Sequence, residues 1–453
     1  IEPSEGSPAA EAGLQAGDII MEINGKDMAQ GDRTPNELTS YVSDNLRGDP
    51  GTTCVLKLER PTADSTYIPM ELKITRGTIR TNPVPYYGMV DKNIGYIAIS
   101  TFAIEGCSKD IKKALIELKQ QGATSIVLDL RGNGGGLLSE AVNVVNFFVP
   151  KGKEIVVTKG KIKQAGSTYK TSNEPIDMEI PLTVLVDGAT ASAAEIVSGS
   201  LQDLDRAVIV GNRTYGKGLV QVPRELPYNS SMKVTTAKYY IPSGRCIQAI
   251  DYAKRNADGS VARIPDSLTT VFHTAAGREV RDGGGIRPDV EVKAERFPNI
   301  MFYLLNDDMI FDYATQYCIK HPNIGEVKDF SVTDADYDDF KQMLKKRNFT
   351  YDRQSEKSLK NLKEIAEFEG YMEGASEEFA ALEKKLTHNL DHELNRFSKQ
   401  IRKAIAEEIV IRHYFQRGVI LERMKDDADL TKAIETLKDK EGYTKILSVP
   451  ADK

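Results

Sequence analysis

Histidine, cysteine and tryptophan are scarce in this 453-residue chain, and each scarcity argues against a class of protein or site. Four of the five histidines lie at His321 or beyond it, so a histidine base in the earlier part of the chain has a single candidate, His273. It stands in the polar stretch VFHTAAGREV, which predicts a surface position. The absence of tryptophan, with 40% hydrophobic and 28% charged residues, indicates a soluble globular chain that needs no bilayer.

The cysteines are far apart and form no CxxC pair, which argues against a zinc site and a disulfide framework. They are Cys54, Cys107, Cys246 and Cys318. The formal net charge of -6 argues against a nucleic-acid partner, because phosphate binding needs a surplus of Lys and Arg. At roughly 150 residues per domain, the length predicts about three domains.

Three regions differ in pattern, and we place their boundaries at 1–77, 78–298 and 299–453. The first combines a Ser-Pro helix start, Gly-Asp and Asn-Gly turns, a helix near 35–46 and two strands, TTCVLKLER and YIPMELKITR. The second alternates strands and helices, which predicts a layered βαβ core. In the third, Gly and Pro thin out and amphipathic helices dominate. The expected fold class is a multidomain α+β or α/β chain.

Ser192 follows a buried strand and a small-residue turn in LVDGATASAAEIVSG, where a helix begins. A sharp strand-to-helix turn exposes a hydroxyl beside outward-pointing backbone N–H groups, as in hydrolase nucleophile sites. The alternative is an ordinary helix N-cap, a common place for serine. A nucleophilic serine also needs a base, and the scarcity of histidine disfavours a Ser-His-Asp triad.

Lys217 in TYGKGLVQ is the candidate base, since lysine can replace histidine when its surroundings favour the neutral amine. Gly216 and Gly218 let the backbone approach other elements closely. If the following segment is extended, Gln221 can hydrogen-bond the amine and orient it. The alternatives are a phosphate-binding loop, for which the full GxxxxGK[ST] pattern is missing, and a plain surface lysine.

The stretch LDLRGNGGGLLSEAV places four glycines between a hydrophobic strand and a helix. Backbone N–H groups freed by such a turn can bind an oxyanion together with the N–H of Ala193. The rival interpretation is a nucleotide-binding loop, but RGNGGG does not give GxGxxG.

Together these motifs resemble the C-terminal processing peptidases, also called tail-specific proteases. The matching pieces run in the family's order from about residue 6 to 293. They are GSPAAEAGLQAGDIIMEING, LRGDPGTTCVLKLER, GYIAISTF, LDLRGNGGGLL, DGATASAAEIVSGSLQD, RAVIVGNRTYGKGLVQ, YYIPSGRCIQ and GGGIRPDVEV. Two departures are Ala194, where the family often has a second serine, and a longer segment at about 249–280.

The resemblance implies a PDZ-like domain, a layered ββα/βαβ (crotonase/ClpP-like) protease core and a C-terminal helical domain. It also implies a serine endopeptidase in which Ser192 is the nucleophile, Lys217 the general base and Gln221 its orienting partner. Ala193 with Gly135 or Gly136 would form the oxyanion hole. Neither a metal nor an organic cofactor is implied. The rival classes are a non-catalytic peptide-binding scaffold and an acyl-transfer enzyme acting on thioesters.

The implied partners are protein or peptide substrates with accessible C termini, because PDZ domains capture peptide tails by strand addition. The carboxylate-binding loop of a PDZ domain normally precedes the segment that starts at Ile1. We therefore expect an upstream segment to carry any signal peptide or lipid anchor, and by resemblance we expect the periplasm or cell envelope.

The helical third presents Glu- and Lys-rich faces that are either solvated surface or a place for an adaptor or for self-association. His388 and His392 lie at i, i+4 spacing, which suits a metal, but the HExxH glutamate is missing and an exposed helix is the simpler interpretation.

Overall fold

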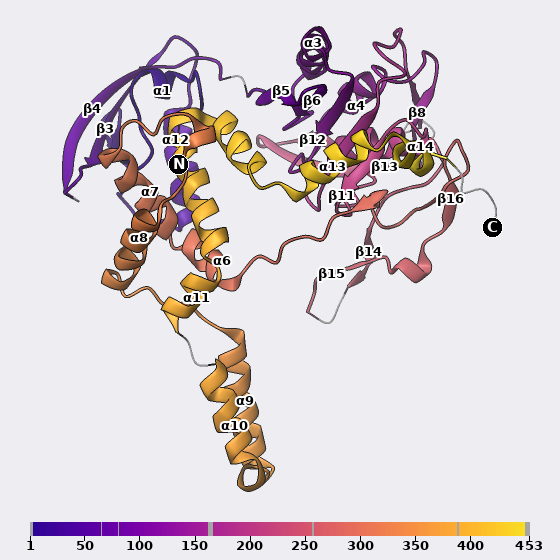
Figure 1. Ribbon diagram of the computed structural model, residues 1–453. Coiled ribbons are helices and arrows are strands. Elements are labelled where there is room, and N and C mark those ends of the chain that lie inside the picture. Colours follow the sequence, from indigo (N-terminus) through magenta and orange to yellow (C-terminus); the bar gives the residue numbers. More distant parts are fainter. Residues whose placement is uncertain are drawn as a thin grey trace. The chain divides into compact units, whose positions relative to one another are not determined.

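The computed structural model describes residues 3–64, 66–79, 81–161, 166–255, 258–386 and 389–448 (Figure 1). Its contacts divide the chain into two compact units. Unit 1 combines residues 1–79 with 295–426, and unit 2 combines 80–294 with 427–453. Within the described residues, no helix has the length and apolar character needed to cross a membrane.

The N-terminal part of unit 1 is a four-stranded antiparallel sheet in the order β2-β1-β3-β4, with two helices. Its core is small, and Ile23, Cys54 and Leu56 are buried at its centre. The second helix begins with a complete capping box between Thr34 and Glu37. The elements are α1 (Pro8–Glu11), β1 (Ile19–Ile23), β2 (Lys26–Asp27), α2 (Pro35–Leu46), β3 (Thr53–Pro61) and β4 (Tyr67–Thr75).

The remainder of unit 1 is helical. A second hydrophobic cluster, which includes Leu304, Phe340 and Ile405, joins most of these helices. The helix α12 contains one non-helical residue, Phe415, where φ is 51° and the helix kinks. The helices are α6 (Asn299–Asn306), α7 (Met309–Lys320), α8 (Asp334–Lys346), α9 (Gln354–Phe368), α10 (Met372–Leu386), α11 (Leu390–Arg396) and α12 (Ser398–Met424).

Unit 2 is built on a six-stranded sheet in the order β18-β11-β10-β7-β6-β5, parallel except for the β5–β6 pair. Helices α3, α4 and α5 share one hydrophobic cluster with this sheet. The elements are β5 (Tyr86–Asp91), β6 (Ile94–Ala98), α3 (Cys107–Gln120), β7 (Ser125–Asp129), α4 (Leu138–Val145), β10 (Leu182–Val186), α5 (Ala193–Asp203), β11 (Val208–Gly211) and β18 (Val290–Glu291).

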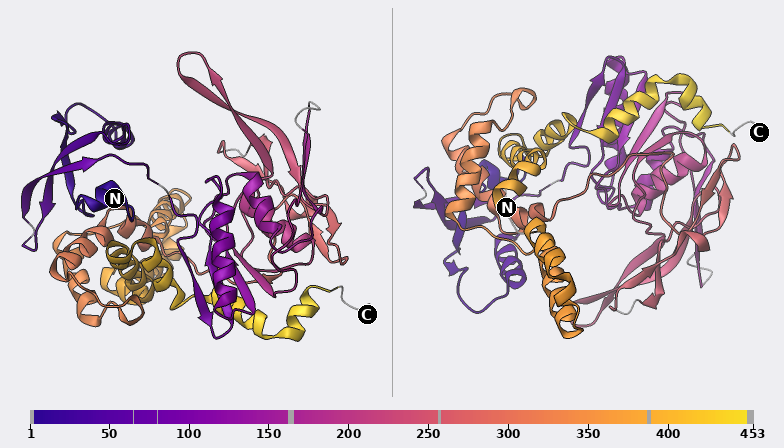
Figure 2. Two further views of the ribbon diagram at one scale, coloured as in Figure 1. Left: turned by 90° about the horizontal axis from the view of Figure 1, so that it is seen from above. Right: turned by 60° about the horizontal axis from the view of Figure 1, so that its bottom comes forward.

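A second, antiparallel sheet of unit 2 has the order β12-β13-β8-β9. Figure 2 shows the β12–β13 hairpin reaching away from the other strands of this unit. The longer segment at 249–280 forms two small hairpins, β14–β15 and β16–β17. The strands are β8 (Glu154–Gly160), β9 (Ser167–Lys170), β12 (Leu219–Leu226), β13 (Ser230–Tyr240), β14 (Ile250–Arg255), β15 (Val261–Arg263), β16 (Val271–His273) and β17 (Glu279–Arg281).

The last helices, α13 (Ala428–Lys438) and α14 (Lys440–Ile446), differ from our division of the sequence. We assigned 299–453 to one helical domain, but residues 427–453 fold with unit 2. There α13 packs on β7, β10 and β11, and the Tyr443 hydroxyl accepts a hydrogen bond from the Leu182 N–H at 3.0 Å. The multidomain α+β class is confirmed; the end of the helical region is what differs.

Candidate active site

Ser192 lies in the turn between β10 and α5, and its backbone is unusual for a residue with a side chain. Its φ is +58° and its ψ is -118°, outside the regions that L-residues normally occupy. The side chain is half-buried. Neighbouring bonds fix the turn: the Ala191 N–H donates to the Asn133 carbonyl at 2.9 Å, and the Thr190 hydroxyl donates to the Leu130 carbonyl at 2.9 Å. The strand-to-helix turn predicted from the sequence is therefore present.

The glycine turn after β7 packs directly on the Ser192 turn. A Cβ at Gly135 would lie 2.7 Å from the Ser192 Cβ and 2.8 Å from the Ala193 nitrogen, and φ there is +95°. Gly136 instead lies against Phe102, whose backbone carbon a Cβ would meet at 2.1 Å. These two positions have no room for a side chain, so the turn can approach the serine only with glycine.

The N–H groups of this turn are not equivalent, which separates the two glycines named as oxyanion donors. The Gly135 N–H donates to the Asn133 side-chain oxygen at 2.9 Å, so it is occupied in this structure. Within the part of the chain that the structure describes, the N–H groups of Gly136 and Ala193 donate no hydrogen bond. Of the predicted oxyanion donors, these two are available.

The Lys217 loop is held against the segment that precedes β14. A Cβ at Gly216 would lie 2.3 Å from the Ala249 Cβ, and one at Gly218 would lie 2.8 Å from the Gln248 nitrogen. The flanking glycines therefore permit the close backbone approach expected from the sequence. Lys217 itself is half-buried.

Glu195 connects the two loops, a role that was not predicted from the sequence. This residue is fully buried in the first turn of α5. One carboxylate oxygen accepts hydrogen bonds from the N–H groups of Ser192 at 2.8 Å and Lys217 at 2.9 Å. The other accepts from the Gly216 N–H at 2.7 Å and the Thr214 hydroxyl at 2.5 Å. A single carboxylate thus fixes the backbone of both predicted catalytic residues.

The protonation of Glu195 reflects two opposing effects. Burial raises the pKa of this carboxyl to about 6, because a charge is costly away from water. The four hydrogen bonds, from Thr214, Lys217, Gly216 and Ser192, act in the opposite direction because they favour the ionised form. Near neutral pH the carboxylate is therefore mostly ionised and able to accept all four bonds.

Tyr239, on β13, is a second link that the sequence analysis missed. Its buried hydroxyl lies 3.2 Å from the Ser192 carbonyl oxygen and also donates to the Lys217 carbonyl oxygen. Burial raises the pKa of this phenol well above its usual value, so it stays a donor. The two loops are therefore joined through carbonyls as well as through N–H groups.

One cavity of about 480 Å³ brings the predicted site residues together. Its lining includes Ser192, Ala193, Gly135, Gly136, Lys217 and Gln221. Gln221 lies on β12, in the predicted extended segment, and is exposed. Among the described residues, no hydrogen bond joins the Ser192 hydroxyl, the Lys217 amine and the Gln221 amide to one another. A second lysine, Lys233, also lines the cavity.

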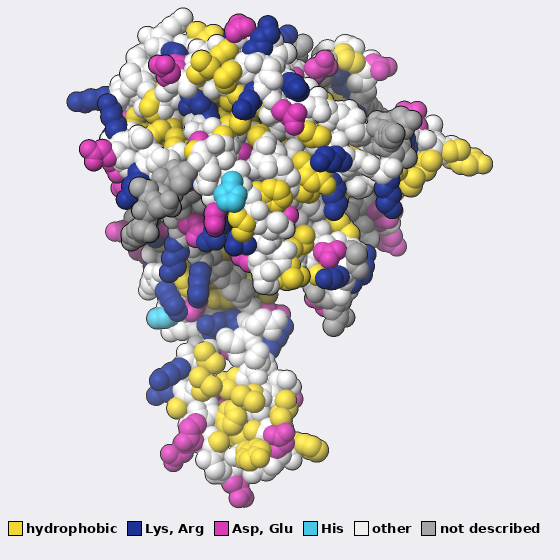
Figure 3. All heavy atoms as spheres, turned by 90° about the vertical axis from the view of Figure 1, so that its right-hand side faces the viewer, with side chains coloured by type: hydrophobic (Ala, Val, Ile, Leu, Met, Phe, Trp, Pro, Cys, Tyr) yellow, Lys and Arg dark blue, Asp and Glu magenta, His cyan; other side chains and the backbone are white. Residues whose placement is uncertain are grey.

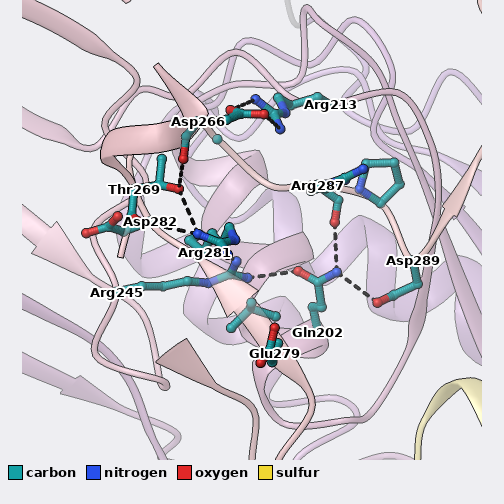
Figure 4. Close-up of a pocket in the computed structure, with 14 residues that line it drawn as sticks. Gln202, Arg213, Arg245, Asp266, Thr269, Glu279, Arg281, Asp282, Arg287 and Asp289 are labelled. Atoms are coloured by element: carbon teal, nitrogen blue, oxygen red, sulfur yellow. Dashed lines mark hydrogen bonds and ion pairs between the residues drawn. The ribbon is translucent and has the colours of Figure 1, made fainter. Parts of the chain in front are cut away.

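A separate, highly charged cavity of about 310 Å³ lies where the 249–280 segment meets the end of α5 (Figure 4). There the Gln202 amide donates to the Arg287 carbonyl at 2.9 Å and to Asp289 at 3.0 Å, and accepts from Arg245 at 2.8 Å. Arg245 also pairs with buried Asp203 at 2.8 Å. None of the predicted site residues lines this cavity, whose bonds anchor the helix that follows Ser192.

None of the histidines in the described ranges lines the Ser192 cavity. His273 is exposed on β16, as predicted. His392 is exposed on α11, while His388 lies outside the described residues. Within the described ranges no cluster of His, Cys, Asp or Glu could hold a metal ion.

Three family models match the chain. Residues 93–254 match peptidase family S41, residues 2–60 match the PDZ domain, and residues 300–437 match the "Probable PDZ-protease, C-terminal helical domain". Each match lies within one of the three regions inferred from the sequence.

The chain is also similar to named proteases. The carboxy-terminal-processing protease of Bartonella bacilliformis is 38% identical over 256 residues, which cover 55% of this chain and 56% of the relative. The carboxyl-terminal-processing protease of Picosynechococcus sp. is 39% identical over 243 residues, 53% of this chain and 55% of the relative. The chain thus spans about half the length of these curated relatives.

A solved structure described as the photosystem II D1 C-terminal processing protease is 30% identical, covering 66% of this chain and 68% of that one, with a TM-score of 0.36. By the family models, the chain contains a PDZ domain, a peptidase family S41 domain and a C-terminal helical PDZ-protease domain, and its relatives are named carboxy-terminal processing proteases.

Proposed function

We propose that this protein is a serine endopeptidase in which Ser192 and Lys217 form a catalytic dyad. The observation that carries the proposal is the Glu195 carboxylate, which accepts hydrogen bonds from the N–H groups of both residues at the rim of one cavity. A buried carboxylate that fixes two loops in this way holds the nucleophile and its base in a fixed relative position. A peptide-binding scaffold has no need of such a connection.

The mechanism follows from these positions. Lys217 accepts the hydroxyl proton as Ser192 attacks a peptide carbonyl carbon. The oxyanion that forms is stabilised by the free N–H groups of Ala193 and Gly136. Lys217 then gives the proton to the leaving amine, and water repeats the cycle on the acyl-enzyme. Gln221, on the same cavity wall, orients the amine once substrate displaces solvent.

Hydrolysis of an unstructured protein such as casein tests the dyad. We expect the wild-type chain to cut it, and Ser192→Ala and Lys217→Ala each to lower kcat by at least about 10³-fold. Lys233→Ala is the matched control, because it removes a lysine from the same cavity and should leave most activity. Equal activity of Lys217→Ala and Lys233→Ala would exclude Lys217 as the base.

The PDZ domain is proposed to recognise the C-terminal tails of protein substrates, by strand addition with backbone N–H groups around the terminal carboxylate. Two peptides that differ only in a free or amidated C terminus test this: amidation should lower kcat/KM. Equal rates would contradict recognition of a free C-terminal carboxylate by the PDZ domain. The cell envelope or periplasm, proposed by resemblance, is tested by cell fractionation.

The second candidate, a non-catalytic scaffold, makes the opposite prediction in the casein assay. It predicts no hydrolysis by wild type and unchanged peptide binding after Ser192→Ala. Labelling of Ser192 by a fluorophosphonate distinguishes a latent enzyme from a scaffold, because only a competent nucleophile reacts.

A further inference from the structure

Helices α9 and α10 form a hairpin whose two helices pack mainly on each other (Figure 1). Leu359 and Ala366 are buried between them. The ion pair Lys363–Glu383, at 2.7 Å, joins the two helices. At the base of the hairpin, Arg353 donates to the Leu386 carbonyl at 2.9 Å. The hairpin is thus a small, well-defined element of unit 1.

The outer surface of this hairpin is unusually apolar. Figure 3 shows hydrophobic side chains gathered on one face of it, in the lower part of the view. Phe368 is 93% exposed and Tyr371 is 68% exposed, both near the tip. Leu362, Ile365 and Leu382 are also exposed. One exposed apolar residue is ordinary, but five on a single two-helix hairpin form a patch of the kind that marks a protein interface.

Charge is distributed unevenly along the hairpin. The tip segment, residues 364–378, contains six glutamates and neither lysine nor arginine. The base segments, residues 354–363 and 379–386, together contain five lysines and two glutamates. All six tip glutamates are exposed, and within the described residues none of them forms an ion pair. The hairpin therefore has an acidic tip and a basic base.

We propose that this hairpin binds the same hairpin of a second copy of the chain, antiparallel and about a two-fold axis. In that arrangement each acidic tip faces the partner's basic base. Leu362, Ile365 and Leu382 of the two copies then face one another, and Phe368 and Tyr371 pack on the base of the partner's hairpin. A two-fold interface must be self-complementary, and a surface with opposite charges at its two ends satisfies this only when the copies run antiparallel. The proposal concerns association and does not rest on the dyad.

The length of the hairpin sets the expected affinity of the dimer. Each helix has 15 residues, so the shared length is about 22 Å. An interface of this length is at the small end for specific complexes, so we expect a dissociation constant on the order of 1–100 μM. Sedimentation equilibrium on the full chain over this concentration range should show a monomer–dimer equilibrium. A monomer at every concentration would overturn the proposal.

Removal of the apolar patch is the first test. The variant Ile365→Ala/Phe368→Ala should raise the dissociation constant at least about tenfold, because these side chains lose their cover in the dimer. The control is Phe302→Ala/Leu305→Ala, which removes two exposed apolar side chains from α6 (54% and 45%) and should leave the dissociation constant unchanged. Because all four side chains are exposed, both variants should unfold at the wild-type temperature. Equal effects of the two variants would contradict a hairpin interface.

Charge reversal is the second, independent test. One variant makes the tip basic, and the other makes the base acidic. The tip variant carries Glu364→Lys, Glu367→Lys, Glu377→Lys and Glu378→Lys; the base variant carries Lys360→Glu, Lys384→Glu and Lys385→Glu. Each variant alone brings like charges together and should dimerise at least about tenfold more weakly than wild type.

Mixing the two charge variants should restore dimerisation, because opposite charges then meet at both ends of the interface. The mixture should also lose affinity as salt is raised from about 0.05 to 0.5 M, since exposed ion pairs are screened. If neither variant weakens association, or if mixing fails to restore it, the two copies do not meet through these ends. Binding of the hairpin to another protein while the chain itself stays monomeric would also overturn the proposal.

Discussion

At the scale of single residues, Glu195 is the group on which the geometry of the candidate active site depends most directly. Its carboxylate accepts from the N–H groups of Ser192 and Lys217 without touching a substrate position. Glu195→Gln keeps the size of the side chain but turns an amide NH₂ towards these donors. We expect kcat to fall about 100-fold with little change in KM, because positioning rather than binding is lost. Unchanged kcat would exclude the positioning role.

The same variant tests the ionisation of Glu195 through stability. The pKa of this carboxyl in the folded protein is about 6, above its ordinary value of 4.5. Between these two values the folded state binds more protons than the unfolded state, so the contribution of Glu195 to stability rises as pH falls. The free energy of unfolding of wild type, relative to Glu195→Gln, should therefore increase by about 1.6 kcal/mol from pH 7 to 4.5.

Urea denaturation of both proteins across that range measures this difference, since all other titrating groups cancel. A constant difference would mean that Glu195 titrates with an ordinary pKa. An acid limb of activity near pH 6 in wild type would then come from another group, because a carboxyl with an ordinary pKa stays ionised at that pH.

Gly135 makes a steric prediction. A Cβ there would meet the Ser192 Cβ at 2.7 Å, so Gly135→Ala should displace the serine turn and lower kcat at least about 100-fold. Gly132→Ala is the matched control. It has a similar positive φ, +71°, but nothing lies within 4 Å of its Cβ position, so it carries only the backbone strain of about 1 kcal/mol. Similar activity of the two variants would show that contact with Ser192 is unimportant.

At this scale, only residues whose chemistry requires a particular residue type could be predicted from the sequence. Ser192, Lys217 and the glycines stand out because nucleophiles, bases and close backbone approaches need particular residue types. Glu195 did carry a signal, since S-x-x-E at a helix start is a capping-box pattern. Its bonds to the Lys217 loop, which lies well beyond α5 in the chain, depend on tertiary packing that no local pattern encodes. Occupation of the Gly135 N–H by Asn133 is hidden for the same reason.

At the scale of elements, Arg131 connects the glycine turn after β7 with the start of α13. Its guanidinium pairs with Asp129 at 2.6 Å, with Asp427 at 2.7 Å and with Asp429 at 3.2 Å. Asp427 is also the N-cap of α13 and accepts from the Leu430 N–H at 2.9 Å. One arginine thus forms ion pairs with three carboxylates where two elements meet.

Arg131→Ala should leave these carboxylates without a cation and lower the free energy of unfolding by about 3 kcal/mol. This is near the lower limit for breaking a buried ion pair, because the Arg131 side chain is about one-fifth exposed. Arg213→Ala is the comparison, since the Arg213–Asp266 pair is exposed and should cost less than about 1 kcal/mol. Chemical denaturation measures both. Equal costs would show that the Arg131 cluster contributes no more than a surface pair.

The elements themselves were largely predictable from the sequence. The helix expected near 35–46 is α2, and the alternation after residue 94 becomes the parallel sheet with its helices. Local hydrophobic periodicity dictates these elements because each must bury one face. The pairing of β12 with β13 and of β13 with β8 to form a second sheet was not predicted, because strand order depends on contacts between distant segments.

At the scale of the whole molecule, residues 427–453 group with unit 2, although their helical sequence pattern placed them in the helical domain that precedes them. Strands β7 and β10 are buried along their whole length, so both faces of the sheet need cover. Alternate residues point to opposite faces: Ile126 and Leu128 join the cluster with α3–α5, whereas Val127 and Leu185 do not. The helix α13 packs on these strands and covers that second face.

Removal of residues 427–453 should therefore destabilise unit 2 rather than the helices of unit 1. The truncation uncovers an apolar sheet face and deletes the buried Leu430, Ala433 and Leu437. Differential scanning calorimetry should show the melting transition of unit 2 lowered by at least about 10 °C, with any separate transition of unit 1 unchanged.

Leu437→Ala isolates the packing contribution in the full chain, and it should lower the free energy of unfolding by about 2–4 kcal/mol. Leu362→Ala, at an exposed position in α9, should have no such effect on a monomer, because no buried contact is removed. If truncation leaves unit 2 intact while unit 1 melts earlier, α13 and α14 belong functionally to the helical domain, as the sequence pattern suggested.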